Sequence, residues 1–193
     1  VNKASPTLGA ALVSAGLVSA VAIDYVLQKQ KIEKVPMGNL LVELGFSSAN
    51  EVARQLAAQR GLRFVNAGEI PEPDTAVAGI FNRSLCLTYG FLPVRENSDG
   101  LIYVVLGDAQ PDAVAELVLR KFGKGCHFFQ GEFDSVAQAI QQHYYFSENP
   151  PARLIESEVR KLEADVDRAY SPARLLEHML HLAVRERATD LHL

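Results

Sequence analysis

The sequence predicts an α+β protein, in which a helical N-terminal part precedes a part with a small sheet. Two observations lead to this fold class. A pattern of helical periodicity occurs twice within residues 1–62, and strand-like segments alternate with helical ones over residues 63–146. A charged helical segment at residues 147–170 is predicted to be a linker, and a last helical segment occupies residues 171–193.

The N-terminal pattern is 24 residues long and extends from Thr7 to Gln30 and again from Pro36 to Gln59. Apolar residues, glycines and the closing glutamine recur in register. The matched pairs are Leu8/Met37, Gly9/Gly38, Leu12/Leu41, Gly16/Gly45, Leu27/Leu56 and Gln30/Gln59. The repeat period of 29 residues is typical of a duplicated supersecondary unit. A ligand that bridges equivalent points of the two copies would suit such a duplication.

Each copy is predicted to form two short helices joined by a glycine turn, because a helix commonly stops at a residue with left-handed backbone. The signals for these helices are Ser5 as N-cap with Pro6 after it, Gly16 and Gly45 as stops, Ser19 as the second N-cap, and Ser48–Glu51 as a capping box. Both copies end in a glutamine on the apolar face. Burial of an unpartnered amide costs a few kcal/mol, so each glutamine is expected to form a hydrogen bond.

The first copy has the order Leu-Gly-x-x-Leu-Val-x-x-x-Gly-Leu-Val, followed by Leu27 and Gln30, and a second copy begins after five residues. This pattern resembles the MshEN domain. Members of that family lie at the N-terminus of type II secretion and type IV pilus assembly ATPases and bind cyclic di-GMP. The resemblance extends over residues 5–146. It implies a regulatory domain in which cyclic di-GMP controls a downstream hexameric motor.

Carried over position by position, the resemblance implies a set of ligand-binding residues. They are Thr7, Leu8, Gly9, Leu12, Gly16, Leu27 and Gln30 in the first copy, and Pro36, Met37, Gly38, Leu41, Gly45, Leu56 and Gln59 in the second. Glycine lets backbone approach a phosphate, and a helix N-terminus offers N–H groups to an anion. Thr7 and Pro36 depart from the family, which has a basic residue, usually arginine, at these positions.

A purely structural role for the same residues is an equal alternative at this stage. Leucines at helical spacing normally form a core, and a glycine that follows a helix normally ends it. Glutamines that recur in register, where a core would accept leucine, favour ligand binding.

The second part is predicted as strands and helices in alternation. The expected elements are an extended stretch Phe64–Ile70, a helix Ala76–Tyr89, strands Phe91–Glu96 and Leu101–Leu106, a helix from Pro111 to about Phe122, a strand Gly125–Gln130 and a helix Phe133–Tyr145. Asp99-Gly100 between the first two strands is a strong hairpin signal. Asp108 is expected to cap the helix that follows it.

After a break at Ser147–Pro151, residues 152–169 form a charged helix with a narrow apolar stripe, which is either a linker or a partner-binding helix. Ser171-Pro172 is predicted to cap the last helix. The final Arg187–Leu193 resembles the Ala-Ser-Asp-Ile-His-Ile sequence that opens the next domain of these ATPases. The resemblance implies a piece of a longer ATPase, with ATP and Mg²⁺ bound only by the domain downstream.

No catalytic motif is found. Gly123-Lys124-Gly125 lacks the first glycine and the hydroxyl residue of a phosphate-binding loop, so the chain itself is not expected to be an enzyme. His178 and His181 lie one helical turn apart beside Glu177, but they are expected to be surface residues and no metal site is predicted. Two cysteines without a CxxC spacing favour a reducing, cytosolic setting.

Three functions remain open from the sequence. The first is the regulatory domain that binds cyclic di-GMP and acts on its own ATPase domain. The second is a docking domain that attaches the ATPase to an inner-membrane platform protein without binding nucleotide, which would place the protein at the inner membrane through its partners. The third, a helix-turn-helix DNA module, is disfavoured by the net charge of −4, so no nucleic acid is expected as partner.

Overall fold

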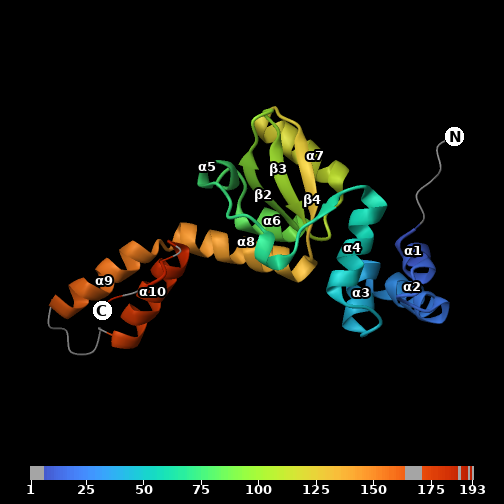
Figure 1. Cartoon of the computed structure of the whole chain (residues 1–193), viewed down its shortest axis with the longest axis horizontal. Helices are drawn as coiled ribbons and strands as arrows, with labels where there is room; N and C mark the ends of the chain where they lie inside the picture. Colours follow the sequence, from blue (N-terminus) through green and yellow to red (C-terminus); the bar gives the residue numbers. More distant parts are fainter. Residues whose placement is uncertain (1–6, 164–170, 187, 191, 193) are drawn as a thin grey trace. The chain divides into compact units, whose positions relative to one another are not determined.

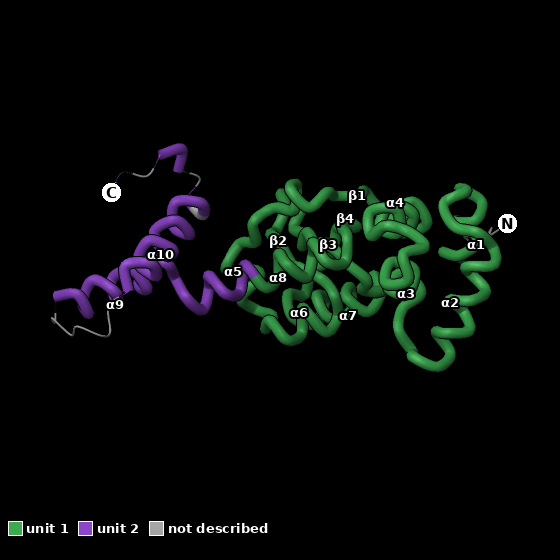
Figure 2. The backbone as a smooth tube through the Cα atoms, turned by 90° about the horizontal axis from the view of Figure 1, so that it is seen from below, with its two compact units in different colours: residues 1–141 green, residues 142–193 purple. Residues whose placement is uncertain are grey.

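The computed structural model describes residues 7–163, 171–186, 188–190 and 192. Contacts divide the chain into two compact units, one ending at Gln141 and the other beginning at Gln142 (Figure 2). The repeat and the sheet therefore belong to one unit. The finer boundaries expected at residues 62, 146 and 170 remain predictions.

The repeat forms four helices. They are α1 (Leu8–Ser14), α2 (Ala20–Glu33), α3 (Met37–Glu43) and α4 (Ala49–Arg60). Ser19 caps α2 and Ser48 with Glu51 forms the capping box of α4, so both predictions are confirmed. The N-cap of α1 is Thr7 rather than Ser5, because the Thr7 side chain accepts from the Ala10 N–H at 3.4 Å. Ser5 and Pro6 lie outside the described residues.

Helices of the two copies pack against each other. Helix α1 of the first copy packs against α4 of the second, and α2 packs against α3. Figure 1 shows these helices at the N-terminal end of the chain, in blue to cyan. The core they enclose contains repeat-related residues, including Leu12 with Leu41 and Ile23 with Val52. The copies thus form one helical body.

The sheet has four strands in the order β1-β4-β3-β2. Its strands are β1 (Arg63–Phe64), β2 (Phe91–Glu96), β3 (Ile102–Leu106) and β4 (Cys126–Gln130). β2 and β3 form the predicted antiparallel hairpin, and β4 is parallel to both β3 and β1. The stretch expected from Phe64 to Ile70 is extended only at its start, since one turn of 3-10 helix, η1 (Ala67–Glu69), follows.

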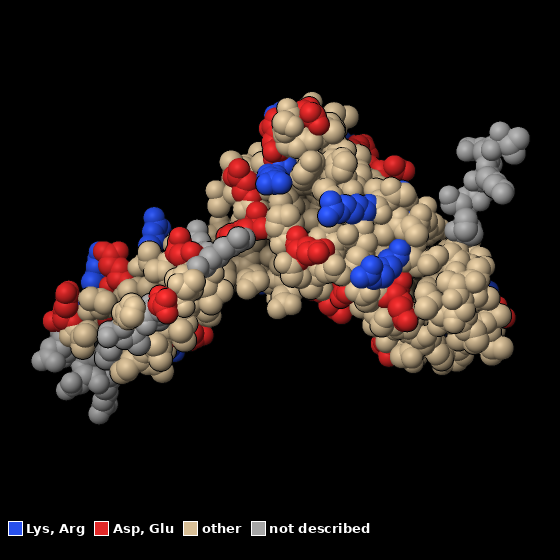
Figure 3. Space-filling model, viewed as in Figure 1, with Lys and Arg blue, Asp and Glu red and all other residues tan. Residues whose placement is uncertain are grey.

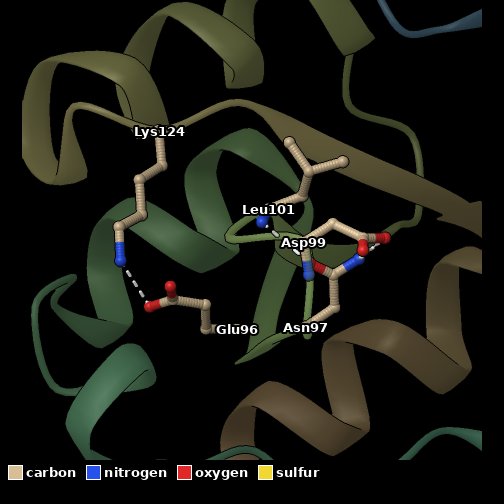
Figure 4. A network of polar contacts seen from close by, with 5 residues as sticks. All are labelled: Glu96, Asn97, Asp99, Leu101 and Lys124. Atoms are coloured by element: carbon tan, nitrogen blue, oxygen red, sulfur yellow. Dashed lines mark hydrogen bonds and ion pairs between the residues drawn. The ribbon is translucent and has the colours of Figure 1, made fainter.

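Asn97 organises the turn of this hairpin (Figure 4). Its side-chain oxygen accepts from the N–H groups of Asp99 at 3.0 Å and Leu101 at 2.8 Å. Gly100 takes the left-handed backbone with φ 76° that the Asp-Gly pair predicts. An ion pair of 2.5 Å between Lys124 and Glu96 closes the same end of the sheet.

The helices of this part are α5 (Thr75–Ala78), α6 (Arg83–Tyr89), α7 (Pro111–Phe122) and α8 (Phe133–Glu148). The prediction of a single helix over Ala76–Tyr89 is wrong, because two helices occupy this range. The Asn82 side chain accepts from the Leu85 N–H at 2.7 Å and starts α6 afresh, since asparagine competes for backbone N–H groups. Phe81, between the two helices, packs edge-on against Phe91 of β2.

The second unit contains the end of α8, then α9 (Pro151–Glu163) and α10 (Pro172–Arg185), which pack against each other. Ser171 caps α10 as predicted, and residues 164–170 of the expected linker helix lie outside the described residues. Hydrogen bonding from Lys161 holds the pKa of the Glu158 carboxyl below its usual value.

Among the described residues, no helix is both long enough and apolar enough to cross a membrane.

Candidate functional site

A cavity of about 880 Å³ lies between the repeat helices and one end of the sheet. The repeat contributes Thr7, Leu8, Gln30, Pro36, Met37, Gly38, Asn39, Val42, Glu43, Ala49, Val52, Ala53, Leu56, Gln59 and Arg60. The segments around β3 and β4 contribute Gly107, Asp108, Gln110, Pro111, Gly131, Phe133 and Asp134. A volume of this order suits a small-molecule site.

Repeat-related residues of both copies line this cavity. Thr7 and Pro36 open the two copies, Leu8 and Met37 follow them, and Gln30 and Gln59 close the copies; all six line the cavity. Gly38 and Leu56 line it as well. The structure thus brings together eight of the fourteen residues nominated from the sequence. Equivalent positions of the two copies therefore contribute to one cavity.

The other six nominated residues lie elsewhere. Leu12 and Leu41 are fully buried in the helical core. Gly16 and Gly45 end α1 and α3 with φ 69° and 70°, the left-handed conformation in which glycine is favoured. Gly9 and Leu27 are absent from the cavity lining, although their counterparts Gly38 and Leu56 belong to it.

Gly9 and Gly38 have a shared packing role. A Cβ at Gly9 would lie 3.0 Å from Ile23 Cγ2, and one at Gly38 would lie 2.8 Å from Val52 Cγ1. Ile23 and Val52 are themselves repeat-related, so the same close helix contact occurs in each copy. A methyl group at Gly38 would force Val52 to shift, and one at Gly9 would make a tight contact with Ile23, so glycine favours close helix packing at both positions.

The closing glutamine of the first copy is already engaged with the backbone. Gln30 Nε2 donates to the Val35 carbonyl at 2.9 Å, which ties the end of α2 to the linker between the copies. The expectation that this amide finds a hydrogen bond is confirmed. The same contact orients the amide at the edge of the cavity.

A polar group at the sheet end of the cavity was missed by the sequence reasoning. Arg60 Nη1 donates to Gln130 Oε1 at 2.7 Å, and Gln130 is fully buried. Gln130 Nε2 in turn donates to the carbonyls of Leu106, Gly107 and Gly131, at 3.1, 2.5 and 3.0 Å. Both ends of the amide are therefore used, and the guanidinium is held against the cavity wall.

Asp108 belongs to this polar group and does not cap α7, whose N-cap is Gln110. Burial raises the pKa of the Asp108 carboxyl, and this effect exceeds the opposing influence of its own backbone N–H, the Asn39 side chain and the charge of Arg60. Burial likewise lowers the pKa of Arg60, which stays protonated. A Cβ at Gly90 would lie 1.9 Å from Asp108 Oδ1, so glycine at residue 90 makes room for the carboxylate.

Five of the described helices begin at the cavity. The lining includes the N-terminal residues of α1 (Thr7, Leu8), α3 (Pro36, Met37, Gly38), α4 (Ala49), α7 (Gln110, Pro111) and α8 (Phe133, Asp134). The N-terminal end of a helix carries partial positive charge and N–H groups without intrahelical acceptors. The backbone therefore makes the cavity more favourable for an anion.

The charged side chains of the lining act in the opposite direction. Arg60 is the one cation of the lining, against the carboxylates of Glu43, Asp108 and Asp134. Thr7 and Pro36 add no positive charge, so the features of the described cavity that favour an anion are the helix N-termini and Arg60.

The chain is similar to known proteins in sequence and in fold. Residues 60–150 match the MshEN domain model. Over 114 residues, which are 58% of this chain, the sequence is 34% identical to the type IV pilus assembly ATPase PilB of Thermus thermophilus. The matched region is 13% of the length of that relative.

Two solved structures share the fold. MshE with cdg superposes with a TM-score of 0.60 at 21% identity, over 72% of this chain and 99% of that one. The N-terminal domain of XpsE gives a TM-score of 0.58 at 20% identity, over 69% of this chain and 91% of that one. The chain is therefore similar to the MshEN domain over residues 60–150 and to a type IV pilus assembly ATPase over 58% of its length.

Proposed function

We propose that the cavity binds cyclic di-GMP and that the chain is the non-catalytic regulatory domain of a secretion or pilus ATPase. The observation that carries this proposal is the pairing of repeat-related residues in the lining: Thr7/Pro36, Leu8/Met37 and Gln30/Gln59. Cyclic di-GMP consists of two identical halves, and a duplicated wall offers each half the same contacts. The neighbour MshE, solved with cdg (cyclic di-GMP), supports the same ligand class.

Each wall element has a role that its chemistry suits. The apolar side chains of Leu8 and Met37 cover flat purine faces. The starts of α3 and α7 present backbone N–H groups to phosphate oxygens. The Asp108 carboxylate accepts from N–H donors, and the guanine edge carries such donors at N1 and N2.

The proposed output is control of a downstream motor at the cytoplasmic side of the inner membrane. Binding orders the repeat helices relative to the end of the sheet, because the cavity is lined by both. A ligand shifts such an equilibrium by the difference in its affinity for the two arrangements. ATP and Mg²⁺ are assigned to the motor domain and not to this cavity.

Isothermal titration calorimetry of the chain with cyclic di-GMP tests the proposal. The expected result is one dinucleotide bound per chain, with GMP giving no comparable heat. Gln30→Leu and Gln59→Leu each lower the affinity about tenfold, as loss of one hydrogen bond to a ligand implies. Gln138→Leu, at an exposed glutamine of α8 remote from the lining, serves as the matched control and leaves affinity unchanged.

Absence of heat at high micromolar ligand would contradict the proposal. The protein-docking function, in which the domain attaches to a platform protein at the inner membrane, would then be favoured.

A further inference from the structure

One face of α2 is apolar and exposed on the side opposite its buried residues. This outer stripe consists of Val21, Tyr25, Gln28 and Ile32, which follow one another at helical spacing. Val21 is 79% exposed, Tyr25 53% and Ile32 83%, whereas Ile23 and Val26 on the opposite side are buried. Figure 3 shows that charged side chains are sparse over the N-terminal helices on the face in view.

The second copy has a helix face equivalent to the outer stripe of α2. Addition of 29 to each stripe position gives Asn50, Arg54, Ala57 and Gly61 of α4 and its C-cap. That face packs against β1 and β4 of the same chain. Asn50 Nδ2 donates to Glu132 Oε1 at 2.5 Å, and the Arg54 guanidinium lies 4.4 Å from the centre of the Phe64 ring.

The two copies therefore use the same helix face differently. In α4, Asn50 and Arg54 of this face contact residues of the sheet part, whereas in α2 three of the four stripe residues are large, apolar and exposed. Three large apolar side chains in line on an exposed helix face are a candidate interaction surface.

We propose that α2 associates with α2 of a second copy of this chain, antiparallel and through the outer stripe. In a seam of alternating three- and four-residue spacing, Tyr25 and Ile32 take one of the two core positions and Val21 and Gln28 the other. Antiparallel packing about a two-fold axis then sets Val21 against Ile32 of the second copy, and Tyr25 against Gln28 of the second copy. Each pair occurs twice, as a two-fold interface requires.

The charges that flank the stripe are complementary in this orientation. Asp24 and Lys31 lie seven residues apart on the same side of the stripe. An antiparallel partner brings Asp24 close to Lys31 of the second copy twice, so both contacts join opposite charges. The other flank is compatible, because Ala22 is small and Lys29 is paired with Glu33 at 3.5 Å and Glu43 at 3.8 Å within the chain.

Sedimentation velocity of the chain over a range of concentrations tests the proposal. The expected result is a reversible monomer–dimer equilibrium. Ile32→Glu weakens it about tenfold or more, because the seam would bury an unpaired charge on each copy. Leu119→Glu, at a 57% exposed leucine of α7, is the matched control and leaves the equilibrium unchanged.

A pair of charge variants distinguishes this seam from any other apolar contact. Asp24→Lys alone and Lys31→Asp alone each place like charges across the seam and weaken self-association. An equimolar mixture of the two variants restores dimers, because each then faces a partner of opposite charge. Circular dichroism of each variant verifies that α2 remains folded.

A wild-type chain that stays monomeric at about 100 μM, a concentration at which interfaces of even modest affinity associate, overturns the proposal. A dimer that is insensitive to Ile32→Glu, or variants whose mixture fails to restore dimers, overturns it as well. Self-association is measured without nucleotide, so its outcome is independent of cyclic di-GMP binding.

Discussion

Arg60 and Gln130, 70 residues apart in sequence, are joined by a hydrogen bond of 2.7 Å at the sheet end of the cavity. The guanidinium belongs to the last residue of α4, and the buried amide belongs to the last residue of β4. Their contact joins the helical body to the sheet and fixes the cation of the cavity lining in one place.

Replacement of Gln130 by leucine removes the acceptor of Arg60 and three donations to backbone carbonyls. Since a buried hydrogen bond to a charged group is involved, the free energy of unfolding should fall by about 3 kcal/mol. Urea denaturation measures this change. Gln141→Leu, at an exposed position of α8, is the control with an expected change near zero; equal effects of the two variants would refute the role assigned to Gln130.

Asp108 should make stability depend on pH in the direction opposite to an ion-paired carboxylate. Its pKa is raised in the folded chain, so the folded state retains the proton where the unfolded state has lost it. Stability from this group is therefore greatest in acid and decreases as pH rises from the ordinary aspartate pKa through the folded one.

Asp108→Asn removes the cost of burying a charged carboxylate. The variant should unfold at a higher urea concentration than the wild type at pH 7, and the two proteins should become alike below the ordinary aspartate pKa of about 3.9. Urea midpoints measured from pH 3 to pH 7 give the comparison. A variant less stable than the wild type at pH 7 would show that the attraction of Arg60, and not burial, dominates.

The side chain that packs against Gly38 should make a larger residue at this position destabilising. Gly38→Ala places a methyl group against Val52 and should lower the free energy of unfolding by about 1–3 kcal/mol, in the range for overpacked cores. The second substitution Val52→Ala provides the missing space, so the double variant should lose less stability than the two single losses added together. Strict additivity would mean that the two residues do not meet.

The sequence predicted features that depend on neighbouring residues and missed contacts between residues far apart in the chain. Ser19, the Ser48–Glu51 capping box, Gly16 and the Asp99-Gly100 turn act within a few residues, and their local chemistry specifies the observed structure. The hydrogen bonds Arg60–Gln130 and Asn50–Glu132 join residues 70 and 82 positions apart. No local pattern indicates such partners, and the cap assigned to Asp108 was wrong for the same reason.

The candidate site shows a different limit. Leu8 and Leu12 lie on neighbouring turns of the same short helix, yet one lines the cavity and the other is fully buried in the core. Helical spacing identifies an apolar face but not which of its members meets a ligand. The recurrence of Gln30 and Gln59 was the more informative signal, because the duplication places both at the same cavity.

Basic residues at the two opening positions should strengthen nucleotide binding. Thr7 and Pro36 line the cavity where the family has arginine, so Thr7→Arg and Pro36→Arg each add a cation beside the proposed phosphates. The affinity for cyclic di-GMP measured by calorimetry should rise about fivefold per substitution, with a smaller gain at high salt. Thr75→Arg, at an exposed residue of α5, is the control for net charge; an equal gain there would remove the local explanation.

A titration of the ¹⁵N-labelled chain with cyclic di-GMP, followed by ¹H–¹⁵N correlation spectra, tests the central claim most directly. The claim predicts that the backbone amides of Gly38, Gly107 and Gly131 and the side-chain amides of Gln30 and Gln59 shift together, because all five residues line one cavity. Gly16 and Gly45, which end helices outside the lining, should stay in place. Shifts confined to Gly16 and Gly45, or unchanged spectra at millimolar ligand, would contradict the claim.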